Sequence, residues 1–368
     1  MVTIMQGDAL EVQGQLPSES ANCIVTSPPY WGLRDYGVDG QLGLEATPEE
    51  YVEKLTEVFR RLRRVLRGDG ILWLNLGDCY ATGAGKVGEH PGGGEQGARW
   101  RGEGSKHDGA KSRGYRGERL ANGRGDQPAV LRQKTVGVGP MTQPNRMPIP
   151  GLKPKDLVGI PWRVAFALQA DGWWLRSDII WSKPNPMPES VTDRATKAHE
   201  YVFMLAKSER YYFDADAIKE PCSWPNGPNS PQSIASPYGQ GFTRRGTKHR
   251  SVEPARGDGV NGGGSQAAGS ISFPTDFRNA RSVWPISTEP FPEAHFATMP
   301  TELARRCILA GCPRGGTVLD PFAGAGTTGL VADRLGRHFV GFELNPEYAE
   351  MAKRRIRNDA PLFAEVNG

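Results

Sequence analysis

Two short segments near opposite ends of the chain have residue types and spacing suited to chemistry. Thr26–Trp31 reads TSPPYW and Leu319–Gly329 reads LDPFAGAGTTG, and each of them continues a short apolar run. Apolar runs that stop at proline-rich or glycine-rich turns are typical of buried parallel strands ending in functional loops. We therefore expect both segments at the carboxyl edge of a sheet, where ligands bind.

The glycine-rich segment predicts a site for a nucleotide-like ligand. Asp320 ends the apolar run, and Gly324 and Gly326 permit close approach of the backbone. Thr327 then opens a helix whose first N–H groups are free, and Glu343 lies where a ribose-binding acid is expected. NAD would place its pyrophosphate on this helix, whereas the ammonium and sulfonium of S-adenosylmethionine suit a carboxylate. A turn that is merely tightened by its glycines is the alternative without a ligand.

The proline-rich segment predicts a rigid pocket for a flipped nucleobase. Two consecutive prolines lock the backbone and remove two N–H donors at a strand's end. Tyr30 can stack on the face of a base, while the Ser27 hydroxyl and the Pro28 carbonyl accept hydrogen bonds from its amino group. Holding both amine protons favours a pyramidal nitrogen and aims its lone pair at a methyl donor, so that positioning and electrostatics do most of the work. As a lone string, SPPY could also be an ordinary proline turn.

Together, the two segments resemble the motifs of the N4-cytosine/N6-adenine DNA methyltransferases. The catalytic motif matches Ser27–Tyr30 and the cofactor motif matches Asp320–Thr328, in the family's beta order. The resemblance implies S-adenosyl-L-methionine as cofactor, double-stranded DNA as substrate, and an α/β, circularly permuted Rossmann-like fold. That fold has a mostly parallel sheet built from both chain ends, with helices on both faces and loop-rich insertions. The catalytic residues implied by the resemblance are Ser27, Pro28, Pro29 and Tyr30.

The resemblance also implies further cofactor contacts. Asp8 in QGDAL would lie near the adenine and Glu343 at the ribose hydroxyls, and HFATMP at His295–Pro300 resembles the motif around the methionine moiety. Trp181–Ser208 resembles the stretch that completes the base pocket. The expected cofactor-binding residues are Asp8, Phe296, Asp320, Phe322, Gly324, Gly326, Thr327 and Glu343.

The target base and three rival functions can be weighed from single residues. Ser27, in place of aspartate, resembles the N4-cytosine branch and favours cytosine, with N6-adenine as the alternative. Methylation of cytosine at carbon 5 needs a nucleophilic cysteine that follows a proline. Pro221–Cys222 has this sequence but lies far from both motifs, so we interpret it as a coincidence. An NAD-dependent oxidoreductase would leave TSPPYW unexplained. A non-catalytic DNA-binding protein would not need both motifs intact.

Basic, glycine-rich insertions interrupt the regular pattern. Residues 82–150 carry 12 Lys and Arg against 6 Asp and Glu, and residues 222–282 carry 7 against 3. Such segments suit a phosphate-binding surface, with solvated loops as the alternative. We expect catalytic segments at 1–81 and 151–219, a flexible insertion at 82–150, target recognition at 220–290 and the cofactor half at 291–368. The DNA-contacting candidates are Trp31, Arg244, Arg245, Lys248 and Arg250. For Trp31, a turn packed against the sheet is the alternative.

Periodicity predicts alternating strands and helices. The clearest helix begins at Thr47 with Pro48 in its first turn and Glu50 completing a capping box, and we expect Gly68 to end it. The other expected helices lie near 156–171, 300–310, 327–335 and 346–358. The expected strands lie near 2–5, 22–26, 71–76, 175–181, 200–205, 211–213, 317–320 and 338–343.

Composition bounds the remaining properties. The five cysteines are scattered without a CxxC pair, which argues against a disulfide framework and a metal site and predicts free, mostly buried thiols. No leader or membrane-spanning run is evident, so the expected location is the cytoplasm of a bacterium, including that of a phage-infected one. A cognate restriction endonuclease is the expected partner, and the enzyme would act as a monomer or homodimer.

Overall fold

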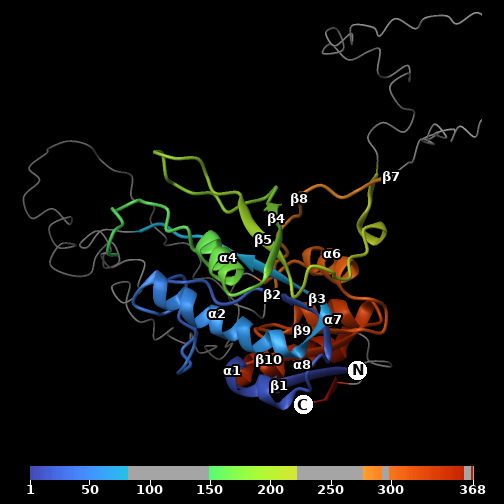
Figure 1. Cartoon of the computed structure of the whole chain (residues 1–368). Coiled ribbons are helices and arrows are strands. Elements are labelled where there is room, and N and C mark those ends of the chain that lie inside the picture. Colours follow the sequence, from blue (N-terminus) through green and yellow to red (C-terminus); the bar gives the residue numbers. More distant parts are fainter. Residues whose placement is uncertain (82–148, 222–276, 292–297, 360–365, 368) are drawn as a thin grey trace, which may run out of the picture. The chain divides into compact units, whose positions relative to one another are not determined.

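The computed structural model describes residues 1–81, 149–221, 277–291, 298–359 and 366–367. Within them, nine strands form one sheet in the order β11-β1-β10-β9-β2-β3-β5-β4-β8 (Figure 1). Neighbours from β11 to β3 are parallel, while β5 runs antiparallel to both β3 and β4. The strands are β1 (Val2–Gln6), β2 (Ala21–Thr26), β3 (Leu66–Leu76), β4 (Trp174–Ser182), β5 (His199–Ala206), β8 (Val283–Pro285), β9 (Thr317–Asp320), β10 (His338–Glu343) and β11 (Val366–Asn367).

The two ends of the chain meet in this sheet, as the permuted order predicts. β1 pairs in parallel with β10, with Val2 opposite Phe339 and Gln6 opposite Glu343. β2 lies on the other side of β9, so the strands that precede the two motifs are neighbours. Since parallel strands end at the same edge, this pairing brings Ser27 and Asp320 together. The expected fold class is confirmed.

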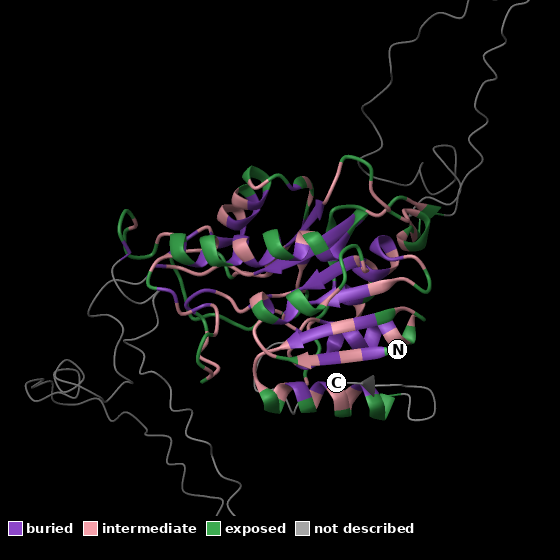
Figure 2. Cartoon of the chain, turned by 60° about the horizontal axis from the view of Figure 1, so that its bottom comes forward, coloured by how far each residue is buried: buried purple, intermediate pink, exposed green. Residues whose placement is uncertain are grey.

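Helices cover both faces of the sheet. α2 (Pro48–Val65) packs against α1 (Ala9–Val12) and α4 (Ile160–Ala170) (Figure 1). Likewise, α7 (Thr327–Arg334) packs against α6 (Thr301–Gly311) and α8 (Pro346–Asp359). The buried residues concentrate along the strands and on the inner sides of the helices (Figure 2).

The predicted start of α2 is confirmed and its predicted end is wrong. The Thr47 side chain accepts a hydrogen bond from the Glu50 N–H at 3.2 Å, and Glu50 accepts one from the Ala46 N–H at 3.1 Å. The helix stops at Val65, and Gly68 lies inside β3. The physical reason is non-local, because Leu66 is fully buried and pairs with β2.

The expected strand at 211–213 is also absent from the described sheet. Tyr212 donates its N–H to the Asp69 carbonyl at 2.8 Å, and the Phe213 ring lies 6.4 Å from that of Trp73. The apolar residues therefore pack as a loop against the sheet.

Residues Ala215–Arg281 form a separate compact unit, which overlaps the region expected to recognise the target. Its described parts are the short helix η4 (Asp216–Ile218) and the antiparallel pair β6 (Glu220–Pro221) and β7 (Phe277–Arg278). Glu220 accepts a hydrogen bond from the Arg281 guanidinium at 2.9 Å, which joins the two ends of this unit.

The reversal of β5 has a functional consequence for the main unit. Its first residues lie beside the last residues of β3, with Tyr201 opposite Leu76, and beside the end of β4, with Glu200 opposite Trp181. The start of β5 thus adds side chains to the edge at which its two neighbours, β3 and β4, end.

Candidate active site

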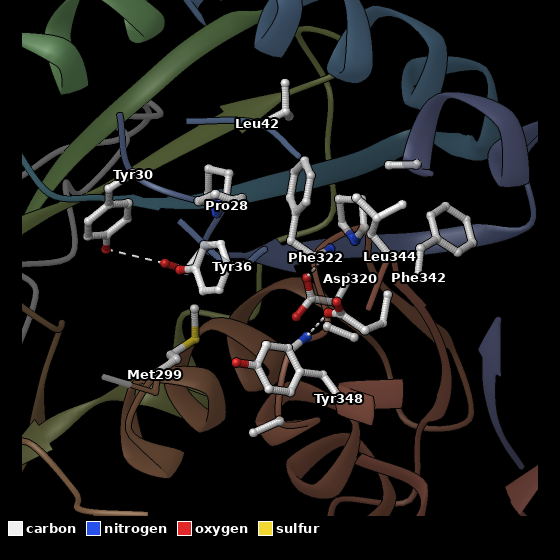
Figure 3. A pocket seen from close by; sticks show the side chains of 18 of the residues that line it. Pro28, Tyr30, Tyr36, Leu42, Met299, Asp320, Phe322, Phe342, Leu344 and Tyr348 are labelled. Carbon is white, nitrogen blue, oxygen red and sulfur yellow. Dashed lines mark hydrogen bonds between the residues drawn. The ribbon is translucent and has the colours of Figure 1, made fainter. Parts of the chain in front are cut away.

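A cavity of about 420 Å³ opens at this edge, within the size range of small-molecule sites. The ends of β1, β2, β9 and β10 contribute to its walls. Figure 3 shows Tyr30 and Pro28 toward one end and Phe322, Leu344 and Phe342 toward the other. One continuous space therefore contains residues of both sequence motifs.

Asp320 ties the two motifs together. Its Oδ1 accepts hydrogen bonds from the Thr26 hydroxyl at 2.6 Å and the Phe322 N–H at 3.0 Å, and its Oδ2 accepts one from the Thr328 hydroxyl at 2.7 Å. The residue is only 3% exposed, yet it lines the cavity. Asp320 therefore orients the glycine-rich turn and the end of β2 and keeps a carboxylate in the cavity wall.

Burial raises the pKa of Asp320 to about 6, although the hydroxyls of Thr26 and Thr328 oppose the shift. Ionised Asp320 attracts a cationic ligand and the protonated form does not. We therefore expect the affinity for S-adenosylmethionine to increase as the pH rises between about 5 and 7, and binding near pH 6 to release a proton. Titration calorimetry in buffers of different ionisation enthalpy measures both effects. If they persist in Asp320→Asn, another group causes them.

Glu343 occupies the predicted place at the end of β10. Its two carboxylate oxygens accept the Gly324 N–H at 2.8 Å and the Asn345 N–H at 2.9 Å. Burial raises its pKa, and the nearby charge of Asp320 contributes to the increase. A carboxylate oxygen accepts more than one hydrogen bond, so Glu343 can also accept from ribose hydroxyls.

Gly326 is the residue on which the turn into α7 depends. It caps the helix with a φ of 74°, and a Cβ built on it would lie 2.8 Å from the Ala352 Cβ of α8. We expect Gly326→Ala to lower the free energy of unfolding by about 2 kcal/mol or more, from left-handed strain plus overpacking. Urea denaturation measures the loss.

The matched control for this variant is Gly315→Ala. Gly315 has a φ of 77° but no atom within 4 Å of its would-be Cβ, so the control carries the strain without the clash. Equal losses in the two variants would show that the close packing of α7 on α8 contributes nothing.

The remaining predicted cofactor residues divide into two groups. Asp8 lines the cavity and caps α1 by accepting the Leu10 N–H at 2.6 Å, and Phe322 also lines the cavity. Thr327 lines it too, but its hydroxyl accepts a hydrogen bond from Arg355 at 2.9 Å and so also fastens α7 to α8. Phe296 lies outside the described residues.

Several cavity residues were missed by sequence reasoning. Tyr36 and Tyr348 meet edge to face with their ring centroids 6.5 Å apart, although they come from distant parts of the chain. Leu42, Phe342 and Leu344 are further apolar wall residues that were missed, whereas Met299 belongs to the predicted segment His295–Pro300 (Figure 3). The positions of Phe342 and Leu344 on either side of Glu343 were the only local signal.

The catalytic motif forms a directed chain of hydrogen bonds. The Tyr30 hydroxyl donates to Oε2 of Glu200 at 2.6 Å, and Ser27 Oγ lies 3.2 Å from the Tyr30 oxygen. Because the Tyr30 proton is directed to a carboxylate, Ser27 must donate its own proton to Tyr30. The lone pairs of Ser27 Oγ then remain as acceptors.

Glu200 is held from two further sides. Asn75, at 2% exposure, donates to its Oε2 at 3.0 Å, and Lys183 forms an ion pair with its Oε1. The Lys183 ammonium also lies 4.5 Å from the Trp181 ring centroid. The resemblance covers Lys183 and Glu200 within 181–208 but did not single them out. The signal was a polar pair, His199 and Glu200, opening an apolar run.

Comparison with known proteins identifies the family. A family model described as DNA methylase matches residues 21–354. The chain belongs to this family. M.Cfr9I of Citrobacter freundii, a type II methyltransferase, is 42% identical over 357 residues, covering 97% of this chain and 88% of that protein. M.SmaI of Serratia marcescens, also a type II methyltransferase, is 42% identical over 354 residues, covering 96% of this chain and 90% of that protein.

Solved structures agree on the fold of this DNA methylase. PvuII DNA methyltransferase, which is cytosine-N4-specific, superposes with a TM-score of 0.53 at 17% identity, covering 100% of this chain and 94% of that chain. A putative DNA modification methylase of Thermus thermophilus, complexed with S-adenosyl-L-methionine, superposes with a TM-score of 0.52 at 22% identity. The match covers 100% of this chain and 98% of that chain. The protein is therefore an S-adenosylmethionine-dependent DNA methyltransferase, and the oxidoreductase and the non-catalytic alternative are set aside.

The cavity fits this cofactor by the chemistry of its walls. S-adenosylmethionine combines a cationic amino-acid part, ribose hydroxyls and a flat adenine. Asp320 offers the methylase a buried carboxylate for the cation, Glu343 offers acceptors for the ribose, and Tyr36, Leu344 and Tyr348 offer apolar surface for the ring. When bound, the cofactor supplies an electrophilic methyl group.

The expected DNA contact of Trp31 is wrong. The residue is 1% exposed, and its indole N–H donates to the Glu45 carbonyl at 2.9 Å. An indole that is already buried in the core of the methylase cannot wedge into DNA; it packs the turn that follows the catalytic motif. Next to it, the Tyr51 hydroxyl donates to the Pro29 carbonyl at 2.8 Å and fixes the motif's backbone.

Other expectations fall partly outside the described residues. Arg244, Arg245, Lys248, Arg250 and Cys222 lie there and are not placed. The four described cysteines of the methylase are free and three of them are buried, as predicted. Across the described ranges, neither a cluster of metal-ligating side chains nor a helix long and apolar enough to cross a membrane is found.

Proposed function

We propose that this DNA methylase transfers the methyl group to N4 of a cytosine flipped out of double-stranded DNA. The observation that carries the proposal is the direction of the chain from Ser27 through Tyr30 to Glu200. Since Ser27 Oγ presents lone pairs, it accepts a hydrogen bond. It therefore pairs with an amine of the base rather than with a carbonyl oxygen. An exocyclic amine is therefore the group that this pocket suits.

Two features favour cytosine over the alternative, adenine. Ser27 stands where the adenine-directed motif commonly has aspartate, as the resemblance indicates. In addition, Lys183 lines the same cavity and has three N–H donors, one of which is used on Glu200. Beside its amine, cytosine presents two acceptors, N3 and O2, whereas adenine presents one, N1, followed by a C–H. A cationic donor at this wall fits the cytosine edge better.

The residues of the pocket would work by holding the amine. Ser27 Oγ and the Pro28 carbonyl accept its two protons, and Tyr30 stacks on the ring. Gly77 directly follows β3, and a Cβ built on it would lie 2.5 Å from the Tyr30 ring. The absence of a side chain at Gly77 therefore leaves room for that ring beside the end of β3. The rigid placement of these groups lowers the entropic cost of aligning the nitrogen for in-line transfer.

Recognition and biological context are also part of the proposal. We assign target recognition to the loop-rich region 220–290, with Arg244, Arg245, Lys248 and Arg250 contacting phosphates, and a second contact to 82–150. M.Cfr9I and M.SmaI are type II methyltransferases, which supports the same class for this chain and a cognate endonuclease as its partner in the cell.

The test is to identify the modified nucleoside. The protein is expressed in a host that lacks DNA methylation, and its DNA is digested and analysed by mass spectrometry, with Ser27→Ala as the control. N4-methylcytosine is the expected product. N6-methyladenine would overturn the base assignment, and sequencing that detects modified bases would give the recognition site from the same DNA.

A further inference from the structure

We infer that Glu200 is the terminal acceptor of the proton that the substrate amine loses, which reaches it through Ser27 and Tyr30. The inference goes beyond the choice of base, because it applies equally to cytosine N4 and adenine N6. It concerns Glu200, at the start of β5, which belongs to neither of the two sequence motifs.

The geometry provides a complete path for the proton. Ser27 Oγ lies 3.2 Å from the Tyr30 oxygen, and that oxygen lies 2.6 Å from Glu200 Oε2. Each donor already points to the next acceptor, so no side chain has to turn before transfer. The path ends at a carboxylate in the wall of the same cavity, and its side chain is 15% exposed.

The balance of atoms requires such an acceptor. When the nitrogen–methyl bond forms and the methyl–sulfur bond breaks, the electron pair stays on sulfur and the nitrogen carries one proton too many. That proton passes to Ser27 Oγ while the Ser27 proton moves to Tyr30 and the Tyr30 proton moves to Glu200. The two hydroxyls end as they began, and the carboxylate becomes a carboxylic acid. Release of product and contact with water restore it.

The surroundings hold Glu200 in position and place a positive charge beside it. Lys183 pairs with one carboxylate oxygen and Asn75 donates to the other. The charged and titratable groups that face Glu200 are Lys183 and Lys197 from the segment between β4 and β5, and Tyr30 after β2. Burial and the Glu200 charge raise the pKa of Tyr30, so its hydroxyl passes protons on without remaining ionised.

The first test separates proton acceptance from mere support. In Glu200→Gln the amide oxygen can still accept the Tyr30 hydrogen bond but cannot take its proton. We expect the single-turnover rate at saturating cofactor and DNA to fall by about 10²-fold or more, since a general base typically contributes about 10²- to 10⁴-fold. Binding of S-adenosylhomocysteine and DNA should be unchanged. If Glu200→Gln keeps the wild-type rate, the inference is overturned, and Glu200 only holds Tyr30 in position.

A second set of variants guards against a folding defect. Tyr30→Phe breaks the path in the middle while keeping the ring and the Glu200–Lys183 pair. If both residues lie on one path, the double variant should lose no more than either single variant. If the rate of the double variant falls by the product of the two single-variant losses, the inference is overturned. Glu350→Gln, on an exposed residue of α8, is the matched control and should keep full activity.

One further readout would not respond to a structural role. In the cofactor-free protein, fluorotyrosine placed at position 30 and followed by fluorine NMR should show a lower pKa in Glu200→Gln than in Glu350→Gln. An unchanged Tyr30 pKa would show that the two groups are not coupled, and would end the inference whichever base is methylated.

Discussion

Replacing Ser27 with alanine is expected to lower the single-turnover methylation rate by about 10²-fold or more. The variant removes the oriented acceptor for the amine and the first step of the path to Tyr30. Losses of this size are typical when one preorganised hydrogen-bonding group is removed from an active site. Rapid-quench measurement of labelled methyl groups in DNA gives the rate.

The internal control for Ser27→Ala is the binding of S-adenosylhomocysteine. The hydrogen bond of Ser27 runs to Tyr30 and not to the glycine-rich turn, so calorimetry should give a wild-type affinity. If cofactor affinity falls together with the rate, Ser27 supports the fold of the whole cavity and its assigned role is wrong.

The second large effect is expected at Asp320. Asp320→Asn keeps the size of the side chain and an oxygen acceptor for Thr26 and the Phe322 N–H. Its NH2 group replaces the acceptor of Thr328, whose hydroxyl can rotate to accept, and the negative charge is removed from the cavity wall. A charged hydrogen bond contributes about 1.5–3 kcal/mol, so we expect the affinity for S-adenosylmethionine to fall by about 10- to 10²-fold. Calorimetry measures the affinity, and the melting temperature should change little.

Asp320→Ala should add a folding defect to the same binding defect. It leaves the buried hydroxyls of Thr26 and Thr328 without their acceptor, which costs about 1–3 kcal/mol for each unsatisfied group. Unchanged cofactor affinity in the asparagine variant would show that Asp320 acts only as the organiser of the turn.

Much of the edge that carries the site could be predicted because its signals are local. The apolar runs before Ser27 and Asp320 are short, end in prolines or glycines, and so indicate strands and their ends. The order of the two motifs indicated the permuted sheet. The capping box at Thr47 marked the start of α2 for the same reason, since the contacts involved lie within four residues.

The features that were missed depend on contacts between distant residues. The end of α2 is decided by the pairing of Leu66 with Ala21, which outweighs the local glycine signal. Glu200 reaches the active site only because β5 runs against its neighbours, and a run of apolar residues does not indicate strand direction. The sequence left Trp31 open between DNA and the core because an aromatic beside a motif can lie in either place, and burial is a property of the folded chain.

The pairing of β1 and β2 with strands from the far end of the chain has a consequence for synthesis in the cell. A growing polypeptide exposes Ser27–Tyr30 early, while the glycine-rich turn after β9 is made only after more than three hundred residues. Closing so long a loop slows folding. A ribosome that stops early therefore releases a fragment in which β1 and β2 lack their neighbours β10 and β9, so the edge that carries the cavity is complete only when translation has passed β10.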